Sequence, residues 1–480
     1  MNKKILATSL LSACAFAGLA VGGTYALFTS NAEANIAIQT ATVKYEATVR
    51  AESLKTYSLG VEQAAGAFEN GGTAALSGNT LTLNNVTPGD KAEVEIKIVN
   101  TSTVKTAYRV VIRNQGDGKL PFNVTGEAAS WVELAPSTNP SENVKVGVEL
   151  PTTVGDDYQG KSYALKIAIE AVQANGVASV DSAEALTAAV KESKTVVMTN
   201  DIELTEMFDI TESPKIDLGG HTLTLPAASA VADGASVEFS NGTLAYAENS
   251  DKNLLEVVGG SLTVDNVDFD LKDATNLSRV PFMVTGGVLN IKNVDVESNR
   301  YYAVTTNNAQ SDAAYTINIE DSTLTASNTE LDNDTVLSNC SYLSRLNIKH
   351  SIIKGQRQAV FVRTGVATIE DSTLISTGEY LNVEKNVTTN ETRLSGTWSS
   401  GNEAPAAALV VGDANAEAYN LPATVTLKNT SIVAENGAKK VVIASDGIYP
   451  ATIKSDAASL ANEDVTKIGT EAKITVEIAA

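Results

Sequence analysis

Five charged residues in one short stretch of the sequence are candidates for a carboxylate site, namely Asp265, Asp268, Asp270, Lys292 and Asp295. Enzymes that cleave polysaccharides use pairs of carboxylates that flank the scissile bond. Spacing by two places Asp268 and Asp270 on one face of a β-strand, but the same spacing is typical of a solvated strand. We favour the solvated strand, so no catalytic residue is predicted from this stretch.

The chain offers few residues for histidine or cysteine chemistry, because it contains only two His and two Cys. The sequence has no His-Glu-x-x-His motif, and a catalytic zinc normally needs two or more nitrogen ligands. His221 follows Gly219-Gly220 and is interpreted as a turn residue, and Cys340 as a small, half-buried residue. Asp156-Asp157 is interpreted as a solvated turn rather than a calcium site. We therefore predict no metal, no cofactor and no enzymatic activity.

Aromatic residues outside the regular strand pattern indicate a different chemistry, because exposed aromatic rings can stack on sugars. Tyr301, Tyr302 and Trp398 are the candidates, and Trp398 lies in a long insertion, Glu379–Tyr419. Two interpretations remain open for them: a glycan-binding face, and packing within loops. Loop packing is the favoured interpretation.

The charge balance excludes several classes of function. The chain has 480 residues, with 57 Asp and Glu against 35 Lys and Arg, and a formal net charge of −22. An acidic chain without a basic patch is a poor ligand for nucleic acid or for an anionic membrane surface. Because 43 % of the residues are hydrophobic, the chain can bury one or more cores, and its length favours two or three domains.

A repeated five-residue pattern is the strongest signal in the sequence, and it reads apolar-polar-apolar-polar-Asn/Asp. Clear copies begin at Val237, Leu262, Leu289, Ile317, Leu346, Ala367 and Val425, and weaker copies at Ile216 and Ala451. Up to Ala367 the copies recur every 21–29 residues, and the next interval is 58 residues. Short strands joined by tight turns at this period predict a parallel β-helix over 201–480. The long interval predicts either an insertion or one degenerate coil.

The last position of the repeat forms a column along the predicted β-helix. Its members are Asn241, Asn266, Asn293, Asp321, His350, Asp371 and Asn429. Asn tolerates the left-handed backbone of a tight turn, and its amide can bond the coils above and below. A column of ligands for metal or sugar is the alternative, but the two acids lie two coils apart, about 10 Å, too far to share a metal. The structural ladder is favoured.

The remaining mature chain divides into a sandwich and a cap. Alternating apolar and polar residues, separated by turn sequences, predict an antiparallel β-sandwich over 27–176. We expect Trp131 to anchor the core between its two sheets. Residues 177–200 are predicted to form a linker and a capping helix, Ser182–Lys191, that covers the first coil.

The first 26 residues have the features of a secretory signal. Lys3 and Lys4 precede an apolar run, and small residues suit a cut between Ala26 and Leu27. Lipidation of Cys14 is a second interpretation, because Leu11–Cys14 fits a lipoprotein box. We expect a secreted protein, extracellular or associated with the cell surface, with no membrane segment after the signal is removed.

The segment Gly22–Ser30 is similar to signals processed by SipW-type signal peptidases. Thr87–Asp90, Ile96–Asn100, Ala107–Val110, Trp131, Gly155–Ser162 and Glu170–Asn175 resemble the corresponding parts of the TasA/camelysin family. Together these likenesses cover residues 1–176. They imply a jelly-roll-like sandwich and an exported fibre or matrix subunit.

The same resemblance implies that an N-terminal strand of one subunit completes the sheet of the next. The donor strand would be Ala34–Val43, with Ile36, Ile38, Thr40 and Val43 as its contact residues. An ordinary first strand within its own domain is the alternative. Camelysin-type proteins are also classed as metallopeptidases, a chemistry that these residues do not support.

The repeat resembles the right-handed, pectin-lyase-like β-helix superfamily, which includes lyases and hydrolases as well as adhesins and passive stalks. A fold of this kind does not decide function. The sequence therefore predicts an all-β secreted surface or biofilm-matrix protein that self-assembles or displays a β-helix adhesin. The alternative is a β-helix protein that binds or cleaves polysaccharide. The expected partners are further copies of itself, glycans or a host surface, and not nucleic acid.

Overall fold

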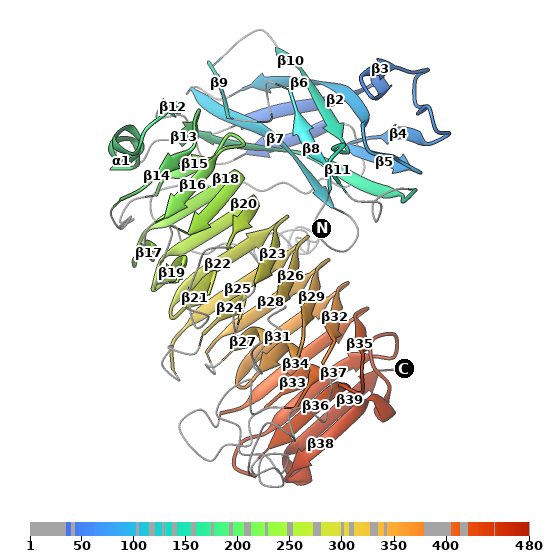
Figure 1. Cartoon of the computed structure of the whole chain (residues 1–480), viewed down its shortest axis with the longest axis vertical. Helices are drawn as coiled ribbons and strands as arrows, with labels where there is room; N and C mark the ends of the chain where they lie inside the picture. The colour runs from blue at the N-terminus through green and yellow to red at the C-terminus, as the bar shows by residue number, and fades with distance from the viewer. Residues whose placement is uncertain are drawn as a thin grey trace, which may run out of the picture.

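The structure is a computed structural model with two β-domains (Figure 1). It describes residues 35–39, 44–101, 105–114, 121–126, 129, 131–136, 142–154, 160–173, 177–191, 195–205, 213–225, 229–246, 253–271, 280–298, 302–306, 312–326, 335–339, 343–378, 405–412, 421–445 and 447–479. Most of the described residues lie in strands, as predicted for an all-β chain. Among them, no helix is long and apolar enough to cross a bilayer.

The first domain is an antiparallel sandwich of two sheets, as predicted. One sheet has the order β1-β2-β6-β10-β8, with β3 paired to β2, and the other has the order β4-β5-β11-β7-β9. The strands are β1 (Asn35–Gln39), β2 (Lys44–Ser58), β3 (Val61–Glu62), β4 (Thr73–Ser77), β5 (Thr80–Asn84), β6 (Asp90–Asn100), β7 (Thr106–Asn114), β8 (Asn123–Thr125), β9 (Val132–Leu134), β10 (Glu142–Glu149) and β11 (Tyr163–Gln173).

The sandwich core follows from the period of two in its strands. In β6 the burial alternates along the whole strand, so that Val94, Ile96 and Ile98 face the core and the charged residues between them face outward. The turn before β6 is closed by Asp90, whose carboxylate accepts hydrogen bonds from the Thr87 amide at 2.8 Å and from the Ser58 hydroxyl at 2.6 Å. Gly89 in this turn has φ +92°, which favours glycine.

The chain enters the second domain through β12 (Val177–Val180), which pairs in parallel with β13 (Thr195–Met198). Between them lies α1 (Ala183–Lys191), which buries Leu186, Ala189 and Val190, the apolar stripe of the predicted helix. The Ser182 hydroxyl accepts a bond from the Ala185 amide at 3.4 Å, a weak N-terminal cap. The helix covers the first coil, as predicted (Figure 1). Because β12 pairs in parallel with β13, the parallel sheet begins at Val177, inside the segment predicted to be a linker.

The second domain is a parallel β-helix built from two long sheets. Besides β12 and β13, the 19-stranded sheet contains β14 (Ile202–Glu203), β15 (Lys215–Asp217), β16 (Thr222–Leu225), β18 (Ser236–Tyr246), β20 (Ser261–Asp270), β22 (Gly287–Lys292), β23 (Asp295–Ser298), β25 (Tyr315–Glu320), β26 (Thr323–Ala326), β28 (Arg345–Lys349), β29 (Ile352–Gly355), β31 (Gly365–Glu370), β32 (Thr373–Ser376), β34 (Ala423–Lys428), β35 (Ser431–Ala434), β37 (Ala451–Asp456) and β39 (Ile474–Ala479). The nine-stranded sheet contains β17 (Ser229–Val231), β19 (Leu255–Val257), β21 (Phe282–Val284), β24 (Val304–Thr305), β27 (Thr335–Asn339), β30 (Gln358–Val362), β33 (Ala407–Val411), β36 (Lys439–Ser445) and β38 (Val465–Gly469).

The strand register follows the sequence repeat, with two corrections. Leu262, Leu289, Ile317, Leu346, Ala367 and Val425 stack in one column. The weak copies are misplaced by two residues, because Ile216 stacks on Phe239 and Val425 stacks on Ile453. A shift of two keeps every side chain on the same face, so the pattern alone could not detect it.

The 58-residue interval holds an insertion and not an extra coil. β31 pairs directly with β34, and β32 pairs directly with β35. In the sequence, the extra residues flank β33, and β33 itself stacks on β30 in the nine-stranded sheet. One coil therefore carries the whole extra length.

Candidate functional site at the junction of the two domains

A buried network of charges joins the sandwich to the β-helix. Arg109, on β7, donates to Glu170 of β11 at 2.9 Å and to Glu238 of the β-helix at 2.6 Å, and also bonds the Ser240 hydroxyl. Arg113, four residues further along β7 and on the same face, forms a two-pronged pair with Asp265. Lys215 donates to the other oxygen of Glu238 at 2.9 Å.

Burial and neighbouring charges have opposite effects on the pKa values of the ionisable side chains in this network. Burial alone would lower the pKa of Arg109 and Arg113, but the carboxylates around them outweigh it and raise both. Burial would raise the pKa of Glu170, but the same two guanidinium groups hold it well below its ordinary value. Lys215 is different, because burial lowers its pKa despite Glu238. The central ion pairs are thus charged together, and each depends on its partner.

Trp131 lies at this junction and not between the sheets of the sandwich, which corrects the sequence prediction. It is 5 % exposed and packs with Ala107 against Val177 and Val197. Arg109 and Lys215 each place their charged group 5.0 Å from the Trp131 ring. The indole therefore supplies the apolar part of the interface and a cation–π surface for two of its buried cations.

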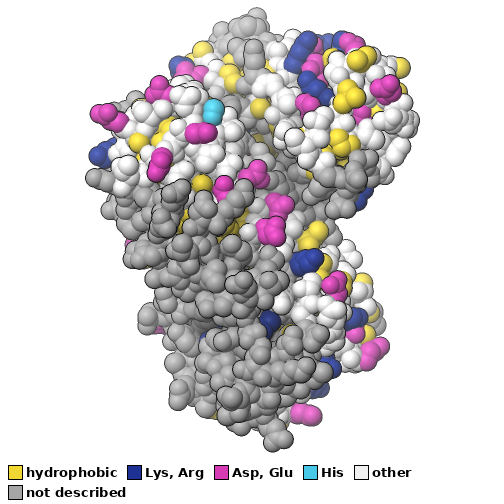
Figure 2. Space-filling model, viewed as in Figure 1, with side chains coloured by type: hydrophobic (Ala, Val, Ile, Leu, Met, Phe, Trp, Pro, Cys, Tyr) yellow, Lys and Arg dark blue, Asp and Glu magenta, His cyan; other side chains and the backbone are white. Residues whose placement is uncertain are grey.

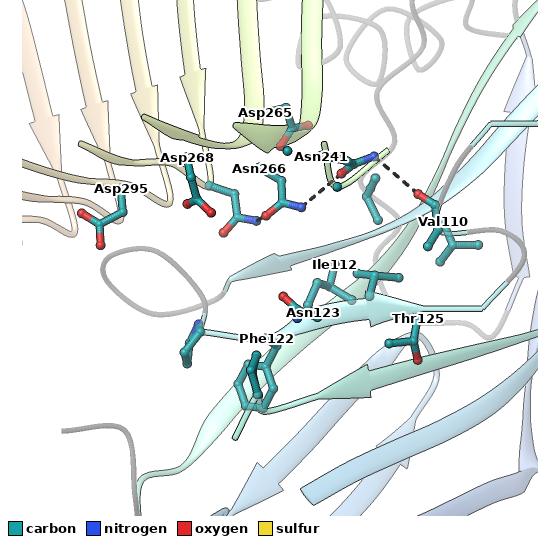
Figure 3. A pocket seen from close by; sticks show the side chains of 18 of the residues that line it. Val110, Ile112, Phe122, Asn123, Thr125, Asn241, Asp265, Asn266, Asp268 and Asp295 are labelled. Carbon is teal, nitrogen blue, oxygen red and sulfur yellow. Dashed lines mark hydrogen bonds between the residues drawn. The ribbon is translucent and has the colours of Figure 1, made fainter. Parts of the chain in front are cut away.

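A cleft of about 680 Å³ opens beside the network, between β7 and β8 of the sandwich and the turns of the β-helix (Figure 3). Asn123 and Thr125 lie on the sandwich side. Asp268 and Asp295 point into the cleft from the β-helix side. Figure 2 shows Asp and Glu side chains gathered on the β-helix surface where it meets the sandwich.

The same β-helix wall carries the asparagine column. The seven predicted members have φ between 46° and 57°, the left-handed conformation that Asn and Asp tolerate best. Asn293 donates to Asn266 at 3.3 Å, and Asn266 donates to Asn241 at 3.1 Å. Asn241 in turn donates to Asp217 at 3.3 Å and to the Ala129 carbonyl of the sandwich at 3.5 Å. The column thus joins the coils to each other and to the first domain.

Further along the rod, away from the cleft, the asparagine column contains ionisable side chains in place of amides. His350 lies between two acids, with Nδ1 3.5 Å from Asp321 and Nε2 3.6 Å from Asp371. The Asp321 carboxylate raises the pKa of His350, and burial raises the pKa of Asp321 itself. Asn429 then donates to Asp371 at 2.7 Å, so an aspartate replaces an amide as acceptor.

A second charged column runs beside the first, one residue earlier in each coil. It consists of Asp265, Lys292, Glu320, Lys349, Glu370 and Lys428, each in register with the next. The sign alternates at every coil, which is favourable for cross-strand pairs. The Lys428–Glu370 pair is 3.6 Å apart. The alternation was visible in the repeat and could have been found by aligning the residue before each Asn/Asp.

The structure does not bring the five charged residues of the candidate carboxylate site together. Asp265 is buried in the ion pair with Arg113, whereas Asp268, Asp270 and Asp295 are exposed. Asp268 and Asp295 are neighbours in register on adjacent coils and share the cleft. Lys292 stacks on Asp265 and Glu320 instead. Among the described residues, no group of three His, Cys, Asp or Glu converges on a metal position.

His221 lies in a turn of the β-helix. Gly219 and Gly220 have φ +61° and +83°, and the His221 amide donates to the Leu218 carbonyl at 2.8 Å. Its Nδ1 is 3.5 Å from the exposed carboxylate of Asp201.

The structure does not support the predicted role of Tyr302 as a glycan contact. Its side chain is 6 % exposed, and its carbonyl accepts a bond from the buried Ser298 hydroxyl at 2.9 Å. The residue is therefore part of the β-helix wall and presents no ring to a ligand. Tyr301 and Trp398 lie outside the described residues, as do Ala26, Leu27, Cys14, Cys340, Thr40, Val43 and Asp156-Asp157.

The candidate donor strand is placed within its own chain. β1 contains Ile36 and Ile38, and among the strands that the structure describes it pairs only with β2, in antiparallel register from Asn35↔Thr48 to Gln39↔Lys44. β1 is thus an edge strand of the first sheet. This is the arrangement expected for an ordinary first strand, in a position that a strand from another copy could also occupy.

The network residues on the sandwich were missed at the sequence level. Arg109 and Arg113 stand in an alternating strand, where outward charged residues are ordinary. The only available signal was that both follow the same face of β7 together with Glu170 on its neighbour β11. No protein-family model, no curated protein and no solved structure matches this chain.

Proposed function

We propose that this protein is a secreted structural protein of the cell surface or extracellular matrix, in which the sandwich holds the β-helix as a rigid rod. The observation that carries the proposal is the buried network of Arg109, Arg113, Glu170, Glu238 and Asp265. Interfaces between domains of one chain usually permit relative motion. Separating these domains would leave several buried charges without partners, so they move as one body.

The shape of the second domain supports a display role. Nine stacked strands in one sheet are separated by eight intervals of about 4.8 Å, and they therefore span on the order of 38 Å. Stacked columns made mainly of Val, Ile and Leu fill its interior, so close packing makes the rod stiff. A stiff rod fixed to a compact domain holds its far end at a constant distance from whatever anchors the sandwich.

Assembly would use the first domain. Among the described strands, β1 forms the edge of its sheet next to β2, and exchange of such a strand between identical copies is a low-cost route to a polymer. The signal-like N-terminus supports export, and the acidic charge of the chain supports solubility and cation-sensitive association. These features favour a matrix or fibre subunit over a freely diffusing protein.

Negative-stain electron microscopy of the protein recovered from culture medium tests this proposal. We expect filaments or regular assemblies with a protruding rod, and their loss when residues 27–43 are deleted. Filaments that persist after that deletion would exclude strand exchange but keep the structural role. Monomers at every protein and cation concentration, together with steady release of reducing ends from a polysaccharide, would overturn the structural role.

A further inference from the structure

One outer face of the β-helix continues the surface on which the sandwich docks. It is formed by the outward side chains of β22, β25, β28, β31 and β34, which follow one another along the rod (Figure 1), and we call it the ladder face. On the two preceding strands, β18 and β20, outward positions of the same sheet hold Glu238 and Asp265. These two acids bind Arg109 and Arg113 of the sandwich. This side of the sheet therefore already docks one β-surface by pairing opposite charges.

Two columns of side chains run along the ladder face. The charged column alternates in sign and contains Lys292, Glu320, Lys349, Glu370 and Lys428. The neutral column lies two residues earlier in each strand and contains Asn290, Asn318, Asn347, Thr368 and Thr426. All ten residues are half-buried or exposed, so both columns reach the surface of the rod.

Hydrogen bonds along the rod hold part of the neutral column in place. Asn318 donates to Asn290 at 2.8 Å, and Asn347 donates to Asn318 at 2.8 Å. Side chains that are already fixed lose little conformational freedom when a partner covers them. The ladder face is thus an ordered polar surface beside a column of alternating charge.

The alternating charge selects one way for two ladder faces to meet. A two-fold axis along the rod would place each coil opposite the same coil of the other copy, so that Lys349 would face Lys349. A two-fold axis along the strands makes the rods antiparallel and keeps each column opposite itself. If that axis passes between β28 and β31, Lys349 lies opposite Glu370, and Glu320 lies opposite Lys428. If it passes through a coil, like charges meet.

The period of the charges also argues for a second copy of this chain as the occupant. A ligand of one sign, such as a polyanion or a basic peptide, would meet a like charge at every second coil. A surface that alternates with the same period, about 4.8 Å per charge, can match the column at each coil. This chain carries such a surface, and the sandwich blocks only the coils before Lys292.

We propose that the ladder face is a self-association surface, on which a second copy of the chain lies antiparallel with each Lys of one charged column against an acid of the other. The surface goes beyond the structural role proposed above, because a purified chain would pair through it whether or not β1 is exchanged. Five strands of five or six residues cover an area of roughly 24 Å by 20 Å. About 500 Å² on each copy is the size of a weak, reversible interface.

Sedimentation equilibrium of the purified full chain at several protein concentrations measures this association. We expect reversible dimers at low salt and weaker dimerisation at high salt, which screens exposed charges. Lys349→Glu with Lys428→Glu makes the charged column mainly acidic, and Glu320→Lys with Glu370→Lys makes it basic. Each double variant should weaken dimerisation by roughly tenfold or more, because like charges then face each other.

An equimolar mixture of the two double variants provides the decisive comparison. It should associate again, since an acidic column then faces a basic one, whereas a loss of fold would not be restored by mixing. Circular dichroism shows that each variant is folded. Lys354→Glu with Lys467→Glu is the matched control, because it makes the same change in net charge on exposed residues of β29 and β38, outside the charged column. It should leave dimerisation nearly unchanged.

Three outcomes would overturn the proposal: a wild-type chain that is monomeric at every concentration in low salt, a mixture that does not associate, or a control that weakens dimerisation as much as the column variants. The wild-type measurement decides the first of these without any variant. Association that none of the charge variants alters would exclude the ladder face and leave strand exchange through β1 as the route, so the two proposals fail separately.

Discussion

Arg113 of the sandwich and Asp265 of the β-helix, 152 residues apart in sequence, meet in a two-pronged ion pair. Nη1 lies 2.8 Å from Oδ1 and Nη2 lies 2.9 Å from Oδ2. The two side chains are 16 % and 6 % exposed. This geometry gives two parallel hydrogen bonds between ionised groups, an arrangement that fixes orientation as well as distance.

Removing one member of this pair should destabilise the whole chain. Asp265→Ala leaves Arg113 buried with less compensating charge, which we expect to cost about 3–5 kcal/mol of unfolding free energy. Chemical denaturation followed by circular dichroism measures the change. Glu95→Ala is the control, because Glu95 pairs with the exposed Arg50 and such pairs contribute about 1 kcal/mol or less. Equal effects of the two substitutions would contradict the role of the junction.

The asparagine column predicts a backbone effect that a hydrogen-bond ladder alone would not produce. Asn293 has φ 49°, so Asn293→Ala should lose a hydrogen bond and add strain, together about 1–3 kcal/mol. Asn293→Gly removes the strain and should be about 1 kcal/mol less harmful than the alanine variant.

Asn290 provides the comparison, since it also bonds along the rod, donating to Thr263 at 3.1 Å, without a positive φ. There glycine should be no better than alanine. Thermal unfolding of the four variants distinguishes the two sites. If glycine and alanine were equivalent at position 293, the backbone explanation would be wrong.

His350 predicts a pH dependence of stability with a definite sign. The Asp321 carboxylate raises the folded-state pKa above the unfolded value of about 6.5. Protonated His350 therefore stabilises the fold fully below about pH 6.5, and this contribution is lost as pH rises through the folded-state pKa. Melting temperatures between pH 5.5 and 8.5 should fall toward alkaline pH.

Two variants separate this effect from other titrations. His350→Asn keeps a residue that tolerates the left-handed turn, and it should flatten the profile in that range. Asp321→Asn removes the carboxylate that raises the pKa of His350, and it should reduce the slope as well. Wild-type slope in the His350→Asn protein would assign the pH dependence elsewhere.

The alternating charged column predicts sensitivity to a single reversal of sign. Lys349 is in register between Glu320 and Glu370, so Lys349→Glu would place three acids in a row and should cost about 1 kcal/mol. Lys354→Glu makes the same charge change between Thr325 and Ile375 and should cost less. The difference should shrink in high salt, which screens exposed charges. Unfolding titrations at low and high salt measure it, and equal costs at low salt would argue against a pairing role.

Local rules determined most of the second domain from the sequence. Alternation with period two defines which face of each strand is buried, and a residue that tolerates positive φ must stand at each tight turn. The repeat therefore predicted the β-helix, its register and the positions of the Asn/Asp column. The errors at the Ile216 and Ala451 copies were both shifts of two residues, which period-two patterning cannot detect.

The junction was decided only by the tertiary structure. Arg109, Arg113 and Glu170 look like ordinary outward charges of a sandwich, and Trp131 looks like an ordinary core residue. They become an interface because β7 and β11 pack on the first coils of the β-helix, where Glu238 of β18 and Asp265 of β20 lie more than a hundred positions away in sequence. Local propensities contain no information on how two finished domains dock, since that depends on charges and surfaces that meet only after both have folded.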